Sequence, residues 1–391
     1  MDFQVGFGRV NITPNPDTDI AMGGYSNQIS TGTLTPLLAS CVAITDSQGS
    51  TLLLYTMDLT DMQKDPIDAL RKKITAATGI PGENITISCT HTHSAPFKSW
   101  LIEAVDLLVQ AGLDALADRV PATLSLGSYE VPQMNWTRHY IMNDGSYAGD
   151  NYGNHSVGYK DYASAADKTM RLIRFQRAGK KDVLLVNWQV HPKLTSTWDT
   201  PEGRATRYLF SSDFIGYTRD AVEEEQDVLF AYFNGASGNV NPFSKLDSEK
   251  DAVSKDGKVY GQQFARHVIT ALSNLEPAEA GNISVKTAPL GDGEFELHAY
   301  CMGKNLGFAT VPVEIFHETG TQIREGSACR MTFVLSCANG RNTYIPISDA
   351  WDFQSNNGQI PYEVRICRYP RGTAESLGKE LGAMLTELAG Q

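Results

Sequence analysis

The segment NITISCTHTHSAP, Asn84–Pro96, joins a predicted strand to two histidines. Apolar and polar residues alternate from Ile85 to Cys89, and the chain then reaches His91 and His93. Alternation with a period of two predicts a β-strand that is buried on one face. Residues i and i+2 of an extended segment point to the same side, so both imidazoles can face one pocket.

Other predicted strands also end in residues that can bind or react. In chain order, these ends carry His191 after DVLLVNWQV, Asn241 in NGASGNVNP after DVLFAYF, Glu314 after GFATVPV, and Tyr344 after MTFVLSCANGRN. Ligands of open α/β sheets bind beyond the carboxyl ends of the strands. We therefore expect these side chains to meet at one site.

Strands and helices alternate along the chain, and no Pro/Gly/Ser-rich linker divides it. This order predicts an α/β fold, a single large domain over residues 1–391 with a mixed β-sheet and flanking helices. A helix is expected to begin at Asp65 as the N-cap, with Pro66 in its first turn. The apolar segment LIEAVDLLVQAGLDALA predicts a buried helix, and leucines at 377, 381, 385 and 388 predict a final amphipathic one.

Charge and composition exclude several classes of partner. The net charge of −12 argues against binding to nucleic acid or to an anionic membrane surface. No apolar window is long enough for a transmembrane segment, and no secretory signal is visible, so we expect a cytoplasmic protein. The six cysteines contain no C-x-x-C pair and are interpreted as buried free thiols.

Imidazoles and a carboxylate at strand ends suit a catalytic zinc ion, which binds neutral nitrogen and hard oxygen donors and keeps a position open for water. Structural interpretations compete with this one. A histidine at a strand end is often a hydrogen-bonded structural residue, Glu314 could favour a helix start, and Tyr344 alone would be read as a core residue. The remaining histidines have no comparable setting.

Taken together, the motifs resemble the catalytic domain of the neutral/alkaline non-lysosomal ceramidase family. The resemblance rests on these segments, in order: GFGRVNITP, MGGYS, CTHTHSAP, NWQVHP, SSDFIGY, FNGASGNVNP, VPVEIF, ANGRNTYIP and the YE step at Tyr362.

The resemblance implies roles for individual residues. The implied zinc ligands are His91, His191, Glu314 and Tyr344. The implied catalytic residues are His93, facing the water or the substrate carbonyl, Tyr362, stabilising the oxyanion, and Arg138. The sequence departs from the family at Asn241, where the family has a serine, so a serine nucleophile is excluded there.

We therefore expect a zinc-dependent hydrolase that cleaves an amide bond of a small, N-acylated molecule with metal-activated water. A second possibility is the hydrolysis of an ester, lactone or glycoside in a small polar molecule, which the polar loops would suit equally well. A third is a non-catalytic binding protein that has kept the pocket, which the loss of the serine would allow.

Overall fold

The computed structural model describes residues 3–15, 20–23, 28–96, 101–197, 201–246, 255–340 and 343–390. Parts of two motifs, residues 24–26 of MGGYS and 341–342 of ANGRNTYIP, lie outside these ranges.

Within the described residues, the largest element is a mixed sheet of nine strands, eight of them in the order β14-β12-β11-β6-β1-β3-β4-β5, with β16 paired to β6. The strands are β1 Gln4–Asn11, β3 Leu38–Thr45, β4 Thr51–Met57, β5 Ile85–Cys89, β6 Val120–Glu130, β11 Thr169–Arg177, β12 Asp182–Trp188, β14 Val228–Asn234 and β16 Glu276–Ala278. β5 runs parallel to β4 and β14 runs parallel to β12, while the other pairs are antiparallel.

A second sheet covers one face of the first. Its order is β17-β18-β19-β21, with β17 Ile283–Leu290, β18 Phe295–Met302, β19 Leu306–Thr310 and β21 Met331–Leu335. The two sheets share an apolar core that includes Phe7 and Phe175 of the large sheet and Phe308 and Phe333 of the small one. Burial of this apolar surface is what holds the two sheets face to face.

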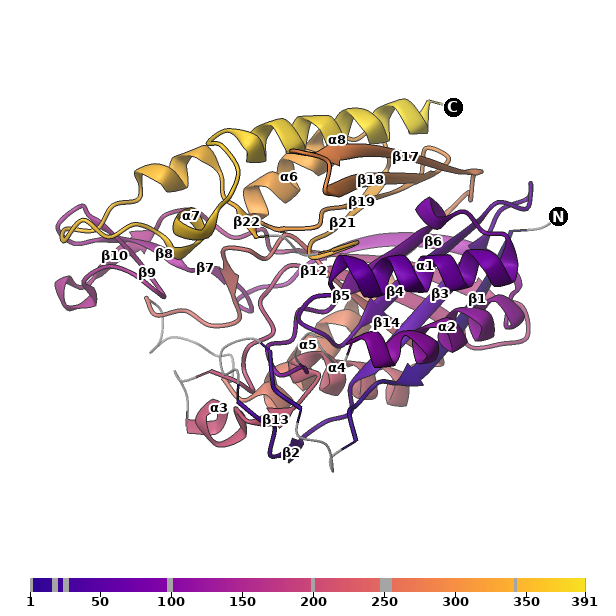
Figure 1. Ribbon diagram of the computed structural model, residues 1–391, viewed down its shortest axis with the longest axis horizontal. Coiled ribbons are helices and arrows are strands. Elements are labelled where there is room, and N and C mark those ends of the chain that lie inside the picture. Colours follow the sequence, from indigo (N-terminus) through magenta and orange to yellow (C-terminus); the bar gives the residue numbers. More distant parts are fainter. Residues whose placement is uncertain are drawn as a thin grey trace.

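Helices cover the outer faces, so the molecule is a stack of four layers (Figure 1). The large sheet is covered by α1 Lys64–Thr78, α2 Leu101–Ala117, α4 Asp213–Glu225 and α5 Gly257–Ala271, and the small sheet by α6 His317–Glu325 and α8 Thr373–Ala389. The predicted α/β fold with a large mixed sheet and flanking helices is confirmed. The second sheet, which takes the place of helices on one face, was not predicted.

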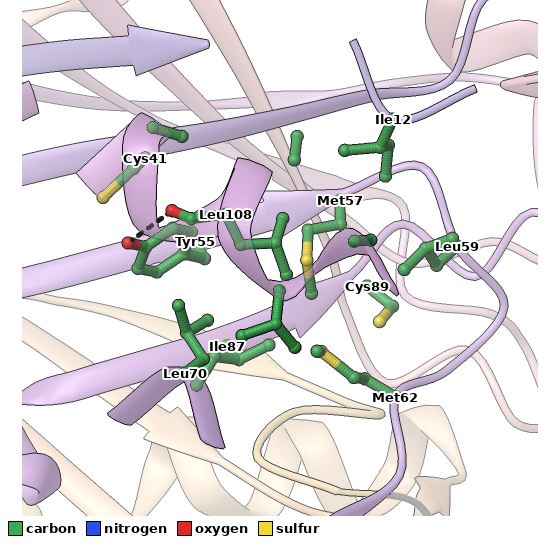
Figure 2. Packing of buried hydrophobic residues seen from close by; sticks show 14 of the residues in the cluster. Ile12, Cys41, Tyr55, Met57, Leu59, Met62, Leu70, Ile87, Cys89 and Leu108 are labelled. Carbon is green, nitrogen blue, oxygen red and sulfur yellow. Dashed lines mark hydrogen bonds between the residues drawn. The ribbon is translucent and has the colours of Figure 1, made fainter. Parts of the chain in front are cut away.

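The packing of α2 against the large sheet depends on small residues. Figure 2 shows this part of the core, where the Tyr55 hydroxyl of β4 donates a hydrogen bond of 3.0 Å to the carbonyl of Leu108 in α2. On β1, a Cβ at Gly6 or Gly8 would lie 2.0 or 2.1 Å from a carbonyl oxygen of α2. The backbone of the helix therefore rests directly on this strand.

Two expectations about the helices are corrected. α1 begins at Lys64 with Gln63 as its N-cap, so the prediction of Asp65 as N-cap is wrong. Asp65 lies instead in the first turn, where a carboxylate is favoured by the helix dipole. α2 is buried on one side only, because Ile102 and Leu107 are 65% and 42% exposed.

The large sheet is curled, which brings its two ends together. β14 and β5 stand at opposite ends of the strand order. Nevertheless, the Thr56 hydroxyl of β4, next to β5, donates a hydrogen bond to the carbonyl of Tyr232 in β14. The carboxyl ends of β5 and β12 therefore open toward the same place.

The described residues also form shorter elements. They are β2 Gly32–Thr33, β7 Trp136–Thr137, β8 His139–Met142, β9 Tyr147–Gly149, β10 Tyr159–Tyr162, β13 Leu209–Phe210, β15 Val240–Asn241, β20 Glu314–Ile315, β22 Tyr344–Ile345, α3 Pro201–Thr206, α7 Tyr362–Ile366 and the 3₁₀ turns η1 Gly82–Asn84, η3 His155–Val157, η4 Leu272–Asn274 and η5 Ser348–Asp352. Among the helices in the described ranges, none has the length and apolarity to cross a membrane.

All six cysteines are free thiols. Four of them are buried as expected, whereas Cys329 and Cys367 are partly exposed. The interpretation of the cysteines as buried thiols is therefore wrong for these two.

Candidate metal centre

Four chain segments that are far apart in the sequence bring the predicted ligands together. His91 follows β5, His191 follows β12, Glu314 begins β20 and Tyr344 begins β22. All four residues are buried, and the most exposed of them, Tyr344, is only 5% accessible.

The donor atoms of these residues lie at a nearly uniform spacing. Glu314 Oε2 is 3.2 Å from His91 Nε2 and 3.3 Å from His191 Nε2. Tyr344 Oη is 3.4 Å from His191 Nε2. These donors therefore lie close together in one cluster.

Both imidazoles are oriented by main-chain carbonyls. His91 Nδ1–H donates to the carbonyl of Thr60 at 2.8 Å, and His191 Nδ1–H donates to that of Ser237 at 2.7 Å. With the proton on Nδ1, each neutral ring presents the lone pair of Nε2 to this cluster. Hydrogen bonds of this kind commonly fix the orientation of metal-binding histidines.

The backbone around His91 has an unusual conformation. Its φ angle is +70°, a left-handed conformation that non-glycine residues seldom adopt. The N–H of His91 donates to the carbonyl of Leu59 at 2.9 Å, which holds the residue in place. Strain of this kind is often found at functional sites, where the surrounding structure maintains it.

Glu314 and Tyr344 are aligned by a short parallel strand pair. They face each other directly in the pairing of β20 with β22. Paired residues on adjacent strands point to the same face of a sheet. This strand pair, only two residues long, therefore directs the Glu314 carboxylate and the Tyr344 phenol to the same side.

The donor set fits a zinc ion. A tetrahedral ion with ligand distances of about 2.0–2.1 Å has ligand–ligand distances of about 3.3–3.4 Å. The observed spacings of 3.2, 3.3 and 3.4 Å match these edges. Two unprotonated imidazole nitrogens and a carboxylate oxygen this close together repel one another unless a cation lies between them.

The pKa values of His91, Glu314 and His191 are shifted by their burial and by one another. Burial lowers the pKa of His91, but Glu314 and Cys337 outweigh it and hold this pKa well above its usual value. Burial raises the pKa of Glu314, but His91 and His191 hold it well below its usual value. Burial, together with the charge of Arg138, lowers the pKa of His191 to about 4.

His93 lies at the edge of this donor set. Its Nε2 is 3.4 Å from His91 Nε2, and its N–H donates to the carbonyl of Pro192 at 3.1 Å. Burial, followed by the charges of His91 and His191, holds its pKa well below its usual value. His91, His93 and His191 also form a compact group that could hold a metal ion, so His93 is close enough to be a ligand itself.

The other two predicted catalytic residues flank Tyr344. The Arg138 guanidinium lies 5.6 Å above the Tyr344 ring and forms a buried ion pair with Glu363. Tyr362, half-buried at the start of α7, packs edge-on against Tyr344 with 6.0 Å between ring centres. All seven predicted site residues are therefore connected through direct contacts.

Asn241 is held in a separate polar group. Its Nδ2 donates to Asp150 Oδ2 at 2.6 Å, and the same oxygen accepts a hydrogen bond from Lys193 at 2.8 Å. Lys193 and Asp150 are both almost completely buried. Burial raises the pKa of Asp150, but the charges of Lys193 and Lys245 outweigh it and keep this pKa well below its usual value. Asn241 therefore orients an ion pair rather than the donor set.

Two residues near the centre were missed from the sequence. Cys337 Sγ is 3.6 Å from His91 Nδ1, and Cys337 forms a second compact group with His91 and Glu314. Because Cys337 closely follows β21, the rule used for the other strand ends could have identified it. Glu363 follows the predicted Tyr362 directly, but nothing in the sequence pairs it with Arg138.

Comparisons with known proteins identify the relatives of this architecture. No family model matches the chain. The chain is 24% identical over 236 residues to neutral ceramidase of Drosophila melanogaster, a match that covers 57% of this chain and 32% of the relative. The matched region thus spans about a third of that relative's length.

Two solved structures have the same fold. The crystal structure of neutral ceramidase from Pseudomonas aeruginosa aligns with a TM-score of 0.77 and 16% identity, covering 100% of this chain and 75% of that one. A structure described as ceramidase complexed with C2 aligns with a TM-score of 0.74 and 15% identity, covering 99% of this chain and 75% of that one. At these identities, the likeness shows the fold.

Proposed function

Since the chain forms a domain of the neutral ceramidase type, we propose that it is a zinc-dependent hydrolase of an amide bond in an N-acylated substrate. One observation carries the proposal. Donor atoms of His91, His191, Glu314 and Tyr344 lie 3.2–3.4 Å from their neighbours in a single buried cluster. Fold alone carries less weight, because one fold serves many functions.

In this proposal His91, His191 and Glu314 hold the ion and Tyr344 is the fourth donor. When bound, zinc acts as a Lewis acid toward a carbonyl and makes water nucleophilic near neutral pH. The carbonyls of Thr60 and Ser237 orient the two imidazoles so that their Nε2 lone pairs would face a bound ion, and Glu314 would offset part of its charge.

The remaining predicted residues handle protons and developing charge. In this proposal His93, whose Nε2 lies 3.4 Å from His91 Nε2, takes a proton at Nε2 and returns it to the leaving amine, which is the role of a general acid/base. Tyr362 and Arg138 both contact Tyr344 and would stabilise negative charge on the carbonyl oxygen. Glu363 holds the Arg138 guanidinium in position.

A second candidate is the hydrolysis of an ester, lactone or glycoside in a small polar molecule. The observation that favours it is the buried charge next to the centre, in the pairs Arg138–Glu363 and Lys193–Asp150. Buried charges are costly unless they are paired, and such polar surroundings suit a hydroxylated or charged substrate.

The proposal is tested by metal analysis followed by a substrate panel. We expect about one zinc per chain in the purified protein and most of it lost in His191→Ala, because His191 supplies one of the convergent nitrogens. The panel compares matched N-acyl amides, esters and glycosides, each with and without a chelator.

Chelator-sensitive cleavage of amides supports the first candidate, and cleavage restricted to esters or glycosides supports the second. The absence of any transition metal, even after zinc is supplied, would contradict both candidates. Stoichiometric zinc without turnover across the panel would favour a binding protein.

A further inference from the structure

Two cysteines outside the metal centre lie in contact with each other. Cys301 is in β18, and Cys329 lies in the segment between α6 and β21. Their Sγ atoms are 3.4 Å apart. A disulfide needs about 2.05 Å between its sulfurs, so side-chain rotation with a small backbone adjustment could join them.

A glycine between the strands creates the space for this contact. β19 runs between β18 and β21, and Gly307 of β19 pairs with Cys301 on one side and with Thr332 on the other. A Cβ at Gly307 would lie 2.9 Å from Cys329 Sγ, which is closer than real Cβ atoms come to such neighbours. Gly307 therefore leaves open the position through which Cys329 reaches across β19.

The two thiols differ in their access to solvent. Cys301 is buried, and its Sγ is 3.5 Å from the carbonyl of Leu385 in α8. Cys329 is partly exposed, so a dissolved oxidant reaches it first. The hydrogen bond from the Cys301 thiol, aided by Ser327 and opposed by burial, lowers the pKa of Cys329 to about 7, which favours the reactive thiolate.

We propose that Cys301 and Cys329 form an oxidation site that closes into a disulfide when the protein meets a small-molecule disulfide such as oxidised glutathione. The Cys329 thiolate attacks one sulfur of the oxidant, forming a mixed disulfide and releasing one glutathione thiolate. Cys301 then loses its proton and attacks the Cys329 sulfur, releasing the second glutathione. Two cysteine thiols are oxidised, and one glutathione disulfide is reduced to two thiols.

The new bond ties β18 to the segment that leads into β21, across β19. It closes a loop that contains Glu314 and all of α6. Cross-linking such a loop restricts the unfolded chain, so we expect the oxidised protein to melt a few degrees higher than the reduced protein.

The experiment treats the reduced, folded protein with oxidised glutathione and follows its intact mass, its disulfide-linked peptides and its melting temperature. We expect a loss of about 2 Da, from two hydrogen atoms. We also expect a linked peptide joining Cys301 to Cys329, a raised melting temperature and full reversal by dithiothreitol. Cys329→Ser should lose the link, whereas the control Cys367→Ser, which removes the other partly exposed thiol, should keep it.

A glutathione adduct that persists on Cys329 would overturn the proposal, because it would mean that Cys301 cannot reach the sulfur. Continued alkylation of both thiols after oxidation, or a link between any other pair of cysteines, would overturn it as well. These readouts require neither metal nor activity.

Discussion

His91 and His93 are two residues apart, but the protein holds them in different ways. His91 is held through its main chain and also through its ring, by Thr60 behind it and Glu314 in front. His93 is fixed through its main chain, and its Nε2 lies at the side of the donor set. We therefore expect His91 to bind the metal and His93 to transfer protons.

Single alanine substitutions separate these roles. His91→Ala should lose zinc and activity together, because it removes a nitrogen from the centre. His93→Ala should keep nearly stoichiometric zinc, while its rate falls by roughly 10²–10⁴, the usual contribution of a general acid/base. Zinc content and turnover of the purified variants check both expectations.

His267→Ala is the matched control, since His267 lies in α5 and makes a ring contact with Tyr129 of β6. Equal loss of zinc from His91→Ala and His93→Ala would show that His93 is also a ligand. A lower melting temperature with unchanged specific activity would mean that both histidines are structural.

Asn241 should contribute less to the rate of catalysis than its position in the family motif implies. Asn241→Ala removes the hydrogen bond to Asp150, but Lys193 still neutralises that carboxylate. The net loss of one hydrogen bond is about 1 kcal/mol, so we expect a decrease in rate of about tenfold or less and unchanged zinc. Complete loss of turnover, or a covalent acyl-enzyme caught by mass spectrometry, would contradict this.

At the scale of single residues, the pattern of predicted strand ends indicated that His91, His191, Glu314 and Tyr344 would meet, and the family resemblance implied that they are ligands. In the structure His91 and His191 follow strands, whereas Glu314 and Tyr344 begin short ones. Cys337 also closely follows a strand, but a thiol in apolar surroundings reads equally well as a core residue. The Arg138–Glu363 pair could not be predicted, since Arg138 lies between β7 and β8 and Glu363 lies in α7, far away in the sequence. Only the folded chain shows that these two charges are buried together.

Among the elements, α2 and β1 show the tightest backbone packing described above. A Cβ at Gly8 would lie 2.1 Å from the carbonyl oxygen of Ala111, a backbone atom that cannot rotate away. Because Gly6 and Gly8 both point toward α2, the helix must move outward as a whole if either gains a side chain.

Gly8→Ala should therefore destabilise the fold by about 3 kcal/mol, at the upper end of the usual cost of overpacking. Chemical denaturation measures the loss. The matched control is Gly82→Ala, where the nearest atom to the new Cβ is 3.9 Å away, in the side chain of Arg71. Equal stability of Gly8→Ala and the wild type would show that α2 does not depend on this contact.

Periodicity predicted most helices and strands correctly because each signal is local. It could not predict that β17, β18, β19 and β21 form a sheet of their own. Strands of either sheet show similar apolar patterns, and only long-range pairing decides which sheet they join. The predicted start of α1 was wrong for a local reason. Gln63 occupies the N-cap without a side-chain hydrogen bond, so the sequence carries no capping signal at that position.

For the molecule as a whole, the proposed ion would join segments from both sheets. His91 and His191 follow strands of the large sheet, while Glu314 follows β19 of the small one. A ligand that binds only the folded state stabilises it, by about 2.7 kcal/mol at a concentration of 100 times Kd.

Removing the metal should therefore lower the melting temperature, and adding zinc should restore it. Thermal unfolding with and without chelator checks this. His91→Ala is the matched control and should show no shift with chelator, because it lacks the site. An identical melting temperature for metal-loaded and metal-free wild type would contradict the proposal that a bound ion stabilises the fold by joining segments of the two sheets.

The order of the donors along the chain has a consequence for biosynthesis. His91 leaves the ribosome early, whereas Tyr344 follows only after β21 has been made. A nascent chain that ends before β22 holds two histidines and a glutamate, but it lacks the strand that pairs with Glu314. In the proposed site, coordination by all four residues would thus require a nascent chain that extends past β22, and any shorter chain would lack the fourth donor.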